Sequence, residues 1–145
     1  MRRQRLTKGF TLVEMMVVIV IIGILAGVLI TQLSNRADRA KVEATKAMIT
    51  QISQQLDLFK LDHNRYPESG RLEDLMVMPG YANPKTWPQG GYFKKAPRDG
   101  WDREFIYRVP GVKDQPYDVV SLGEDGRDGG QGTMEDLWNH DAYKR

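Results

Sequence analysis

The stretch Lys8-Gly9-Phe10-Thr11-Leu12-Val13-Glu14 joins a basic leader to a long apolar run. The leader carries four cationic side chains and no acidic one: Arg2, Arg3, Arg5 and Lys8. Beyond the stretch, residues 15–30 (MMVVIVIIGILAGVLI) contain no polar side chain. A helix of about 20 apolar residues crosses the hydrocarbon core of a bilayer. Residues 10–34 are therefore expected to form a membrane-spanning helix.

The charge of the leader predicts how this helix is oriented. Lys and Arg next to a membrane span stay on the cytoplasmic side, so the N-terminus is expected in the cytoplasm and residues after 34 outside it. Residues 31–34 (TQLS) lack the small-x-small pattern of a secretory cleavage site. This argues against removal of the whole apolar run.

Glu14 is the one acidic side chain inside the apolar run. A carboxylate at mid-bilayer costs about 2.5–3.5 kcal/mol, and less near the interface, so such groups usually have a partner. Residue chemistry leaves two interpretations open. Either the side chain reaches the lipid headgroups, or it pairs with a cation that a partner supplies.

The composition limits how the rest of the chain can be stabilised. The chain has 145 residues, a formal net charge of +2 and no cysteine, which predicts one small domain without disulfides or thiolate sites. Such a domain needs a bound metal ion, oligomerisation or packing on a long helix. The basic excess belongs partly to the leader, so nucleic acid is not an expected partner.

Residues 35–62 are predicted to continue the helix as an amphipathic segment, because they contain neither Pro nor Gly. One stripe of side chains recurs at spacings of three and four: Val42, Thr45, Ile49, Ile52, Leu56 and Phe59. The stripe is expected to pack against the rest of the chain, and a partner helix is the alternative. Asn64 and Pro67 end the helix.

Residues 63–145 are predicted to form a small domain with a sheet. Residues 72–78 favour a short helix. Residues 103–109 (REFIYRV) and 117–122 (YDVVSL) are β-prone and are joined through Pro110-Gly111, which predicts an antiparallel pair. Because two strands alone are marginally stable, a third short strand is expected.

Residues 121–137 (SLGEDGRDGGQGTMEDL) combine acidic side chains with glycines. Carboxylates and inward-turned carbonyls are the oxygen ligands that calcium takes, while a solvated acidic loop is the alternative. The EF-hand pattern fails because Arg127 and Gly129 stand where oxygen-bearing side chains are needed. The GGxGxD repeat fails at Met134.

The chain is not predicted to be an enzyme. Its two histidines, His63 and His140, are far apart in the sequence. Ser121 lacks the glycine two residues earlier that a nucleophile elbow requires. No glycine-rich loop ends in Gly-Lys-Ser or Gly-Lys-Thr.

The motif over residues 9–14, followed by the apolar run, resembles the type IV pilin signature. The resemblance implies that a prepilin peptidase removes residues 1–9 by cutting between Gly9 and Phe10, and that Phe10 becomes N-methylated. It implies that Glu14 sets the register of subunits in a helical filament, where it pairs with the cationic amine of Phe10 in another copy. Pilin-like proteins commonly have a proline at the position of Thr31, so no proline kink is expected there.

The second half of the chain is similar to the major pseudopilins of type II secretion systems. The shared pattern comprises Tyr117-Asp118, the segment 121–126, Gly129-Gly130 and the segment 136–138. The resemblance implies a calcium loop over residues 121–137. Its implied ligands are the side chains of Asp125 and Asp136 and the carbonyls of Leu122 and Arg127, with Asp128 and Glu135 as further candidates.

The resemblance also implies a fold and a function. The expected fold is α+β and type IV pilin-like, with a long N-terminal membrane-spanning helix packed on a small antiparallel sheet and a C-terminal calcium loop. The expected protein is an inner-membrane subunit with a periplasmic domain that polymerises into the pseudopilus of type II secretion. Its expected partners are other copies, minor pseudopilins, the inner-membrane secretion platform and the prepilin peptidase/methylase.

Two alternative functions remain open at this point. One is a type IV pilin or minor pseudopilin in adhesion, motility or DNA uptake. The other is an ordinary single-span protein with a calcium-binding outer domain.

Overall fold

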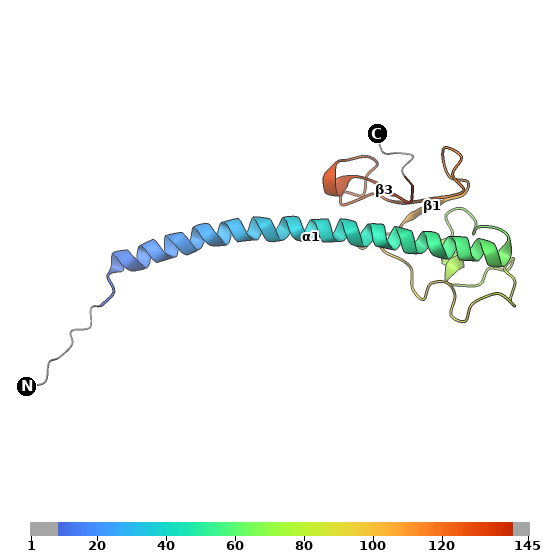
Figure 1. The fold of residues 1–145 in the computed structure, drawn as a ribbon, viewed down its shortest axis with the longest axis horizontal. Coiled ribbons are helices and arrows are strands. Elements are labelled where there is room, and N and C mark those ends of the chain that lie inside the picture. The colour runs from blue at the N-terminus through green and yellow to red at the C-terminus, as the bar shows by residue number, and fades with distance from the viewer. Residues whose placement is uncertain (1–8, 141–145) are drawn as a thin grey trace, which may run out of the picture. The chain divides into compact units, whose positions relative to one another are not determined.

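Helix α1, Leu12–His63, is the longest element of the protein (Figure 1). The computed structural model describes residues 9–140, without the side chains of residues 28–35. These residues form two compact units that divide between Ala37 and Asp38. The helix is continuous through Thr31. Residues 1–8, most of the predicted leader, lie outside the described residues.

The first unit exposes the large apolar side chains that the structure describes in it. The large apolar side chains from Phe10 to Leu25 are all exposed, from 43% of the surface of Met15 to 80% of that of Phe10. Among residues 9–140, no helix meets the length and apolarity required of a membrane-crossing segment.

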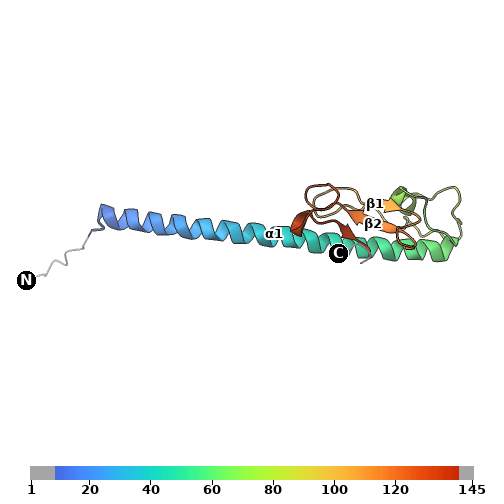
Figure 2. The same ribbon diagram turned by 90° about the horizontal axis from the view of Figure 1, so that it is seen from above.

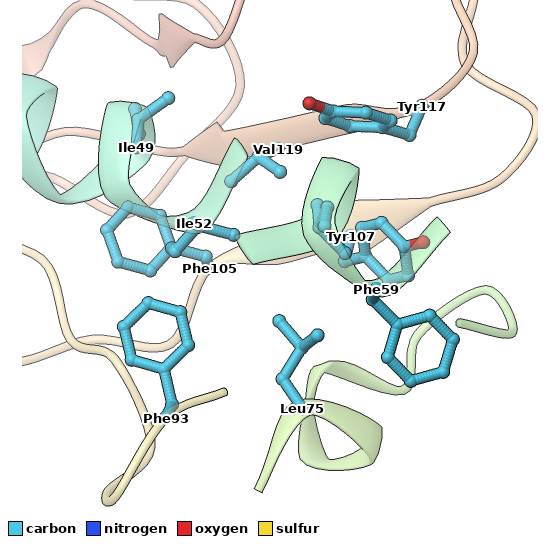
Figure 3. Close-up of a cluster of buried hydrophobic side chains, with 10 residues drawn as sticks. Ile49, Ile52, Phe59, Leu75, Phe93, Phe105, Tyr107, Tyr117 and Val119 are labelled. Atoms are coloured by element: carbon cyan, nitrogen blue, oxygen red, sulfur yellow. The ribbon is translucent and has the colours of Figure 1, made fainter. Parts of the chain in front are cut away.

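The second unit is built on the C-terminal half of α1. Five members of the predicted stripe are buried, namely Thr45, Ile49, Ile52, Leu56 and Phe59, and Val42 is half-buried. Ile49, Ile52, Leu56 and Phe59 form one hydrophobic cluster with side chains from the rest of the unit: Leu75, Phe93, Phe105, Tyr107, Tyr117 and Val119 (Figure 3). The prediction that the stripe packs against the rest of the chain is confirmed. Fully burying one such aliphatic side chain contributes about 1.5–3 kcal/mol.

The sheet lies beside this half of α1 (Figure 2). It has three antiparallel strands in the order β1 (Ile106–Arg108), β2 (Asp118–Ser121) and β3 (Leu137–Trp138). Tyr107 pairs with Val119, and Ser121 pairs with Leu137. The strands are shorter than predicted, and the expected third strand is β3. The segment predicted as a short helix forms the 3-10 helix η1, Leu72–Leu75.

The acidic segment connects β2 with β3. The segment leaves the end of β2 and returns at the start of β3, so its two ends are paired side by side. All four residues of β2 are buried because β2 is the central strand.

A tight turn before β1 approaches the backbone of α1. The Gly100 N–H donates to Thr45 Oγ1 at 2.8 Å, and that hydroxyl donates to the Lys41 carbonyl at 2.8 Å. A Cβ on Gly100 would lie 2.4 Å from the Lys41 oxygen. Only glycine therefore permits this approach.

We expect Gly100→Ala to lower the free energy of unfolding by about 1–3 kcal/mol, because the turn must move away from α1. Thermal unfolding followed by circular dichroism measures the loss. Gly80→Ala is the matched control, since a Cβ there would meet nothing within 4 Å. Equal melting temperatures for the two variants would show that the Gly100 contact does not constrain the fold.

Two tyrosines in the second unit are held in their neutral form. Tyr66 donates to Asp57 Oδ1 at 3.2 Å, and Tyr81 donates to the buried carboxylate of Asp74. Burial, followed by the charge of Asp57, raises the pKa of Tyr66 from 10.0 to about 12. Burial and the hydrogen bond to Asp74 raise the pKa of Tyr81 to about 12.

These shifts predict a loss of stability in alkali. The folded state binds the phenolic protons more tightly than the unfolded state, so their contribution is complete below pH 10.0 and is lost as the pH rises towards about 12. Melting temperatures measured across this range should fall less steeply for the Tyr66→Phe, Tyr81→Phe double variant than for the unmodified chain. Identical slopes would contradict the assignment.

Candidate functional site

Thr11 and Glu14 form a reciprocal cap at the start of α1. Glu14 Oε2 accepts hydrogen bonds from the Thr11 N–H at 2.8 Å and the Thr11 hydroxyl at 3.0 Å. The Glu14 N–H donates to Thr11 Oγ1 at 3.2 Å. This is a capping box, which satisfies N–H groups that a helix start leaves unpaired. Thr-x-x-Glu is the sequence signature of a capping box. Glu14 therefore has a role in capping α1 in addition to the role predicted from its charge.

The predicted cleavage position lies just ahead of this cap. Gly9 and Phe10 precede α1 and are both exposed. A Cβ on Gly9 would meet nothing within 4 Å. The peptide bond between them therefore lies outside the helix.

The acidic loop begins on a buried hydrogen-bonded frame. The Ser121 hydroxyl donates to Asp99 Oδ2 at 2.7 Å, and the Gly123 N–H donates to Ser121 Oγ at 3.3 Å. Asp99 Oδ1 accepts from the N–H groups of Trp101 and Arg103, each at 2.9 Å. Both Asp99 and Ser121 are buried. Sequence reasoning missed Asp99, because no local pattern connects it to a loop more than twenty residues away.

The loop then folds back on itself. The Glu124 N–H donates to the Thr133 carbonyl at 2.9 Å, and the Thr133 hydroxyl donates to the Glu124 carboxylate. Gly130 adopts φ +88°, and a Cβ there would lie 2.3 Å from the Met134 carbonyl oxygen. Glycine is thus required where the two halves of the loop meet.

Asp136 is the predicted ligand whose carboxylate has a buried oxygen without a hydrogen-bond partner among the described residues. Its Oδ2 accepts a hydrogen bond from the Gly129 N–H at 2.9 Å. Its Oδ1 is buried and has no hydrogen-bond partner among the described residues. Burial raises the pKa of Asp136, and the charges of Asp128, Asp125 and Glu135 raise it further. The carboxylate therefore lies in a negative field with an unused oxygen.

The other predicted ligands are placed less tightly. Asp125 is exposed, and its Oδ1 accepts from the Arg127 N–H at 3.1 Å. The Leu122 carbonyl accepts from the Gly126 N–H at 3.2 Å. Asp128 and Glu135 are exposed. Within residues 9–140, no three His or acidic side chains gather into a group able to hold a metal ion.

The donor set nevertheless suits a hard cation. The predicted ligands offer oxygen atoms only, from carboxylates and backbone carbonyls, and calcium takes six to eight such ligands with flexible geometry. Carbonyls and waters can complete a shell to which few side chains contribute. The buried free oxygen of Asp136 is the observation that favours a bound cation.

Comparison with known proteins identifies two matching family models. Residues 32–140 match the model described as "Type II secretion system (T2SS), protein G". Residues 4–30 match the "Prokaryotic N-terminal methylation motif". Together the two models span the apolar run and the domain that follows it.

Individual relatives agree with these models. The chain is 45% identical to type II secretion system core protein G of Pseudomonas aeruginosa over 97% of this chain and 98% of the relative. It is 39% identical to the protein of the same name from Vibrio cholerae over 96% and 95%.

A solved structure is also similar. The crystal structure of the major pseudopilin from the type 2 secretion system of enterohaemorrhagic Escherichia coli matches with a TM-score of 0.56 and 28% sequence identity. The match covers 74% of this chain and 92% of that one. The chain belongs to the protein G family of the type II secretion system, the family of major pseudopilins.

Proposed function

We propose that this chain is the structural subunit that polymerises into the pseudopilus of a type II secretion system. Its family is one of structural pseudopilins, which are not known to be enzymes. The observation that carries the proposal is the row of exposed apolar side chains from Phe10 to Leu25. A surface of this size requires burial outside the chain.

Two environments can bury this surface in succession. Before assembly, residues 10–34 would cross the inner membrane once, with the N-terminus in the cytoplasm and the second unit in the periplasm. After assembly, the same side chains would pack against other copies in a helical filament. Gly23, Ala26 and Gly27 support close packing because small residues let helices approach one another.

Processing would connect the two environments. Cleavage between Gly9 and Phe10 creates a cationic amine on Phe10, and N-methylation retains the charge. Glu14 is the anion available to it in an assembled bundle of helices. Removing one partner of a buried ion pair costs about 3–5 kcal/mol, because the other charge stays buried.

The acidic loop is proposed to bind calcium. Asp136 and Asp125 would supply side-chain oxygens, and Leu122 and Arg127 would supply carbonyls. Bound calcium would neutralise the negative field around Asp136 and use its free Oδ1. The loop would thereby be stabilised against the sheet, together with any contacts that it makes to the secretion platform, minor pseudopilins or other copies.

The filament proposal is tested by complementing a deletion strain. We expect loss of this gene to leave the exported enzymes in the periplasm, and the unmodified gene to restore their export. Glu14→Gln should not restore export, because it removes the anion while keeping the shape of the side chain. Glu73→Gln, an exposed carboxylate of the second unit, is the matched control and should restore it.

Mass spectrometry of the protein from the complemented strain tests the processing step. The expected mature chain begins at Phe10 and carries one added methyl group. A mature chain that still begins at Met1 would exclude assembly by the pilin route. Export restored by Glu14→Gln would exclude the proposed role of the carboxylate.

Calcium is tested by melting temperature in the presence of calcium or of a chelator. A ligand at 100 times its dissociation constant stabilises by about 2.7 kcal/mol, so the unmodified chain should melt higher with calcium. Asp136→Asn should lose this response. In chelator it should be at least as stable as the unmodified chain, because it relieves the repulsion from Asp128, Asp125 and Glu135.

Asp114→Asn is the control for this experiment, since Asp114 is exposed and lies outside the loop. It should keep the full response to calcium. An unmodified chain that melts at the same temperature in both conditions would overturn the calcium assignment.

A further inference from the structure

Arg103 reaches the first half of the acidic loop from the turn before β1. Its Nη1 donates to the Gly123 carbonyl. A Cβ on Gly126 would lie 3.1 Å from Arg103 Cζ and 3.3 Å from its Nε and Nη1. The guanidinium thus contacts the loop at two positions three residues apart.

The backbone of Arg103 is itself fixed. Its N–H donates to Asp99 Oδ1 at 2.9 Å, and its carbonyl accepts from the Asp99 N–H at 3.0 Å. Asp99 Oδ2 in turn holds Ser121, the last residue of β2. The side chain therefore extends from a turn that is tied to the strand from which the loop departs.

No carboxylate competes for this guanidinium among the described residues, whose ion pairs involve other cations. Arg remains protonated in proteins and donates through a planar, rigid fork. A hydrogen bond from such a cation to a carbonyl is stronger than one between neutral groups. The guanidinium of Arg103 thus donates to the backbone of the loop rather than to a carboxylate.

The second half of the loop is held differently, through the hydrogen bonds between Thr133 and Glu124 in the first half. Gly129 and Gly132 both have positive φ, and a Cβ at either would meet nothing within 4 Å. The Gly129 N–H instead donates to Asp136, a predicted calcium ligand. The two halves of the loop therefore differ in what holds them.

We propose that Arg103 is a positioning residue that holds residues 122–127 in their folded form before calcium binds. The inference rests on the proposed calcium site and names a residue that acts on it without coordinating the metal. The Gly123 carbonyl is directed to Arg103, which leaves the Leu122 and Arg127 carbonyls and Asp125 as the donors of this half. Calcium would then meet a first half that is already held, and a site that is ordered beforehand loses less conformational entropy on binding.

A nearby cation also repels calcium, and the two effects have opposite signs. Loss of support weakens calcium binding, whereas loss of repulsion tightens it. The hydrogen bond to Gly123 and the contact with Gly126 indicate that support is the larger effect. The sign of the change in affinity is therefore the decisive measurement.

The test uses the full chain in detergent micelles. In chelator, Arg103→Ala should speed hydrogen exchange of the amides of residues 123–126 by about ten-fold, because local opening becomes easier. Calorimetric titration with calcium chloride should give a dissociation constant raised by about ten-fold, within the usual range of coupling between sites. Arg103→Lys keeps the charge but not the fork, and should recover part of both losses.

A matched pair of glycine variants separates the Arg103 contact from backbone strain. Gly126 and Gly132 have nearly equal φ, +66° and +68°, but only Gly126 lies against Arg103. Gly126→Ala should weaken calcium binding more than Gly132→Ala. The excess should disappear when Arg103 is also alanine, as expected of a double-mutant cycle.

The outcomes distinguish this proposal from the calcium assignment. An unmodified chain that takes up no calcium would refute the assignment and, with it, the role of Arg103 towards the metal. If the unmodified chain binds calcium and Arg103→Ala binds it equally or more tightly, the assignment stands and the positioning role is refuted. A lower melting temperature with unchanged exchange and affinity would make Arg103 a general stabilising residue and also refute the proposal.

Discussion

The packing of one stripe of α1 against the sheet supports everything else in the second unit. Ile52, Leu56 and Phe59 are fully buried, and the strands contribute Tyr107 and Val119 to the same cluster. A three-stranded sheet with strands of two to four residues is too small to be stable alone. The helix supplies the apolar surface that the sheet lacks, in a domain that has no disulfide.

This packing also sets the position of the acidic loop. Thr45 on α1 accepts from Gly100, and the adjacent Asp99 binds Ser121 at the end of β2. Gly123 then donates to Ser121. Hydrogen bonds on both sides of the Asp99–Gly100 peptide bond therefore connect the helix with the first residues of the loop.

The loop combines repulsion and support in a short segment. Several carboxylates lie close enough to raise the pKa of Asp136, while Arg103 and the Asp99 frame hold the opposite half in place. Repulsion between carboxylates destabilises the folded loop when no cation is bound. The same carboxylates attract a cation, which would relieve the repulsion. The domain tolerates this repulsion because the hydrophobic cluster on α1 provides most of its stability.

The sequence by itself determined the elements that depend on neighbouring residues. The spacing of Ile49, Ile52, Leu56 and Phe59 predicted the helix and its buried face, and two β-prone runs joined through Pro110-Gly111 predicted the strand pair. The motif around Gly9 and Glu14 indicated a pilin-like protein, and the pattern of residues 117–138 indicated the family that the comparisons show. These features are readable because the period of a helix or strand and a short processing motif are local properties of the chain.

Only the tertiary structure decided which distant residues serve the loop. Asp99 and Ser121 are 22 residues apart, and Arg103 and Gly123 are 20 apart, so no periodic pattern connects either pair. Ligand chemistry suggested a set of carboxylates. The way in which the loop folds back decided that Asp125, Asp128 and Glu135 are exposed, and that residues 9–140 contain no three-residue group able to hold a metal ion. Contacts of this kind depend on chain reversal at glycines with positive φ and on the docking of a turn onto α1, which local sequence does not encode.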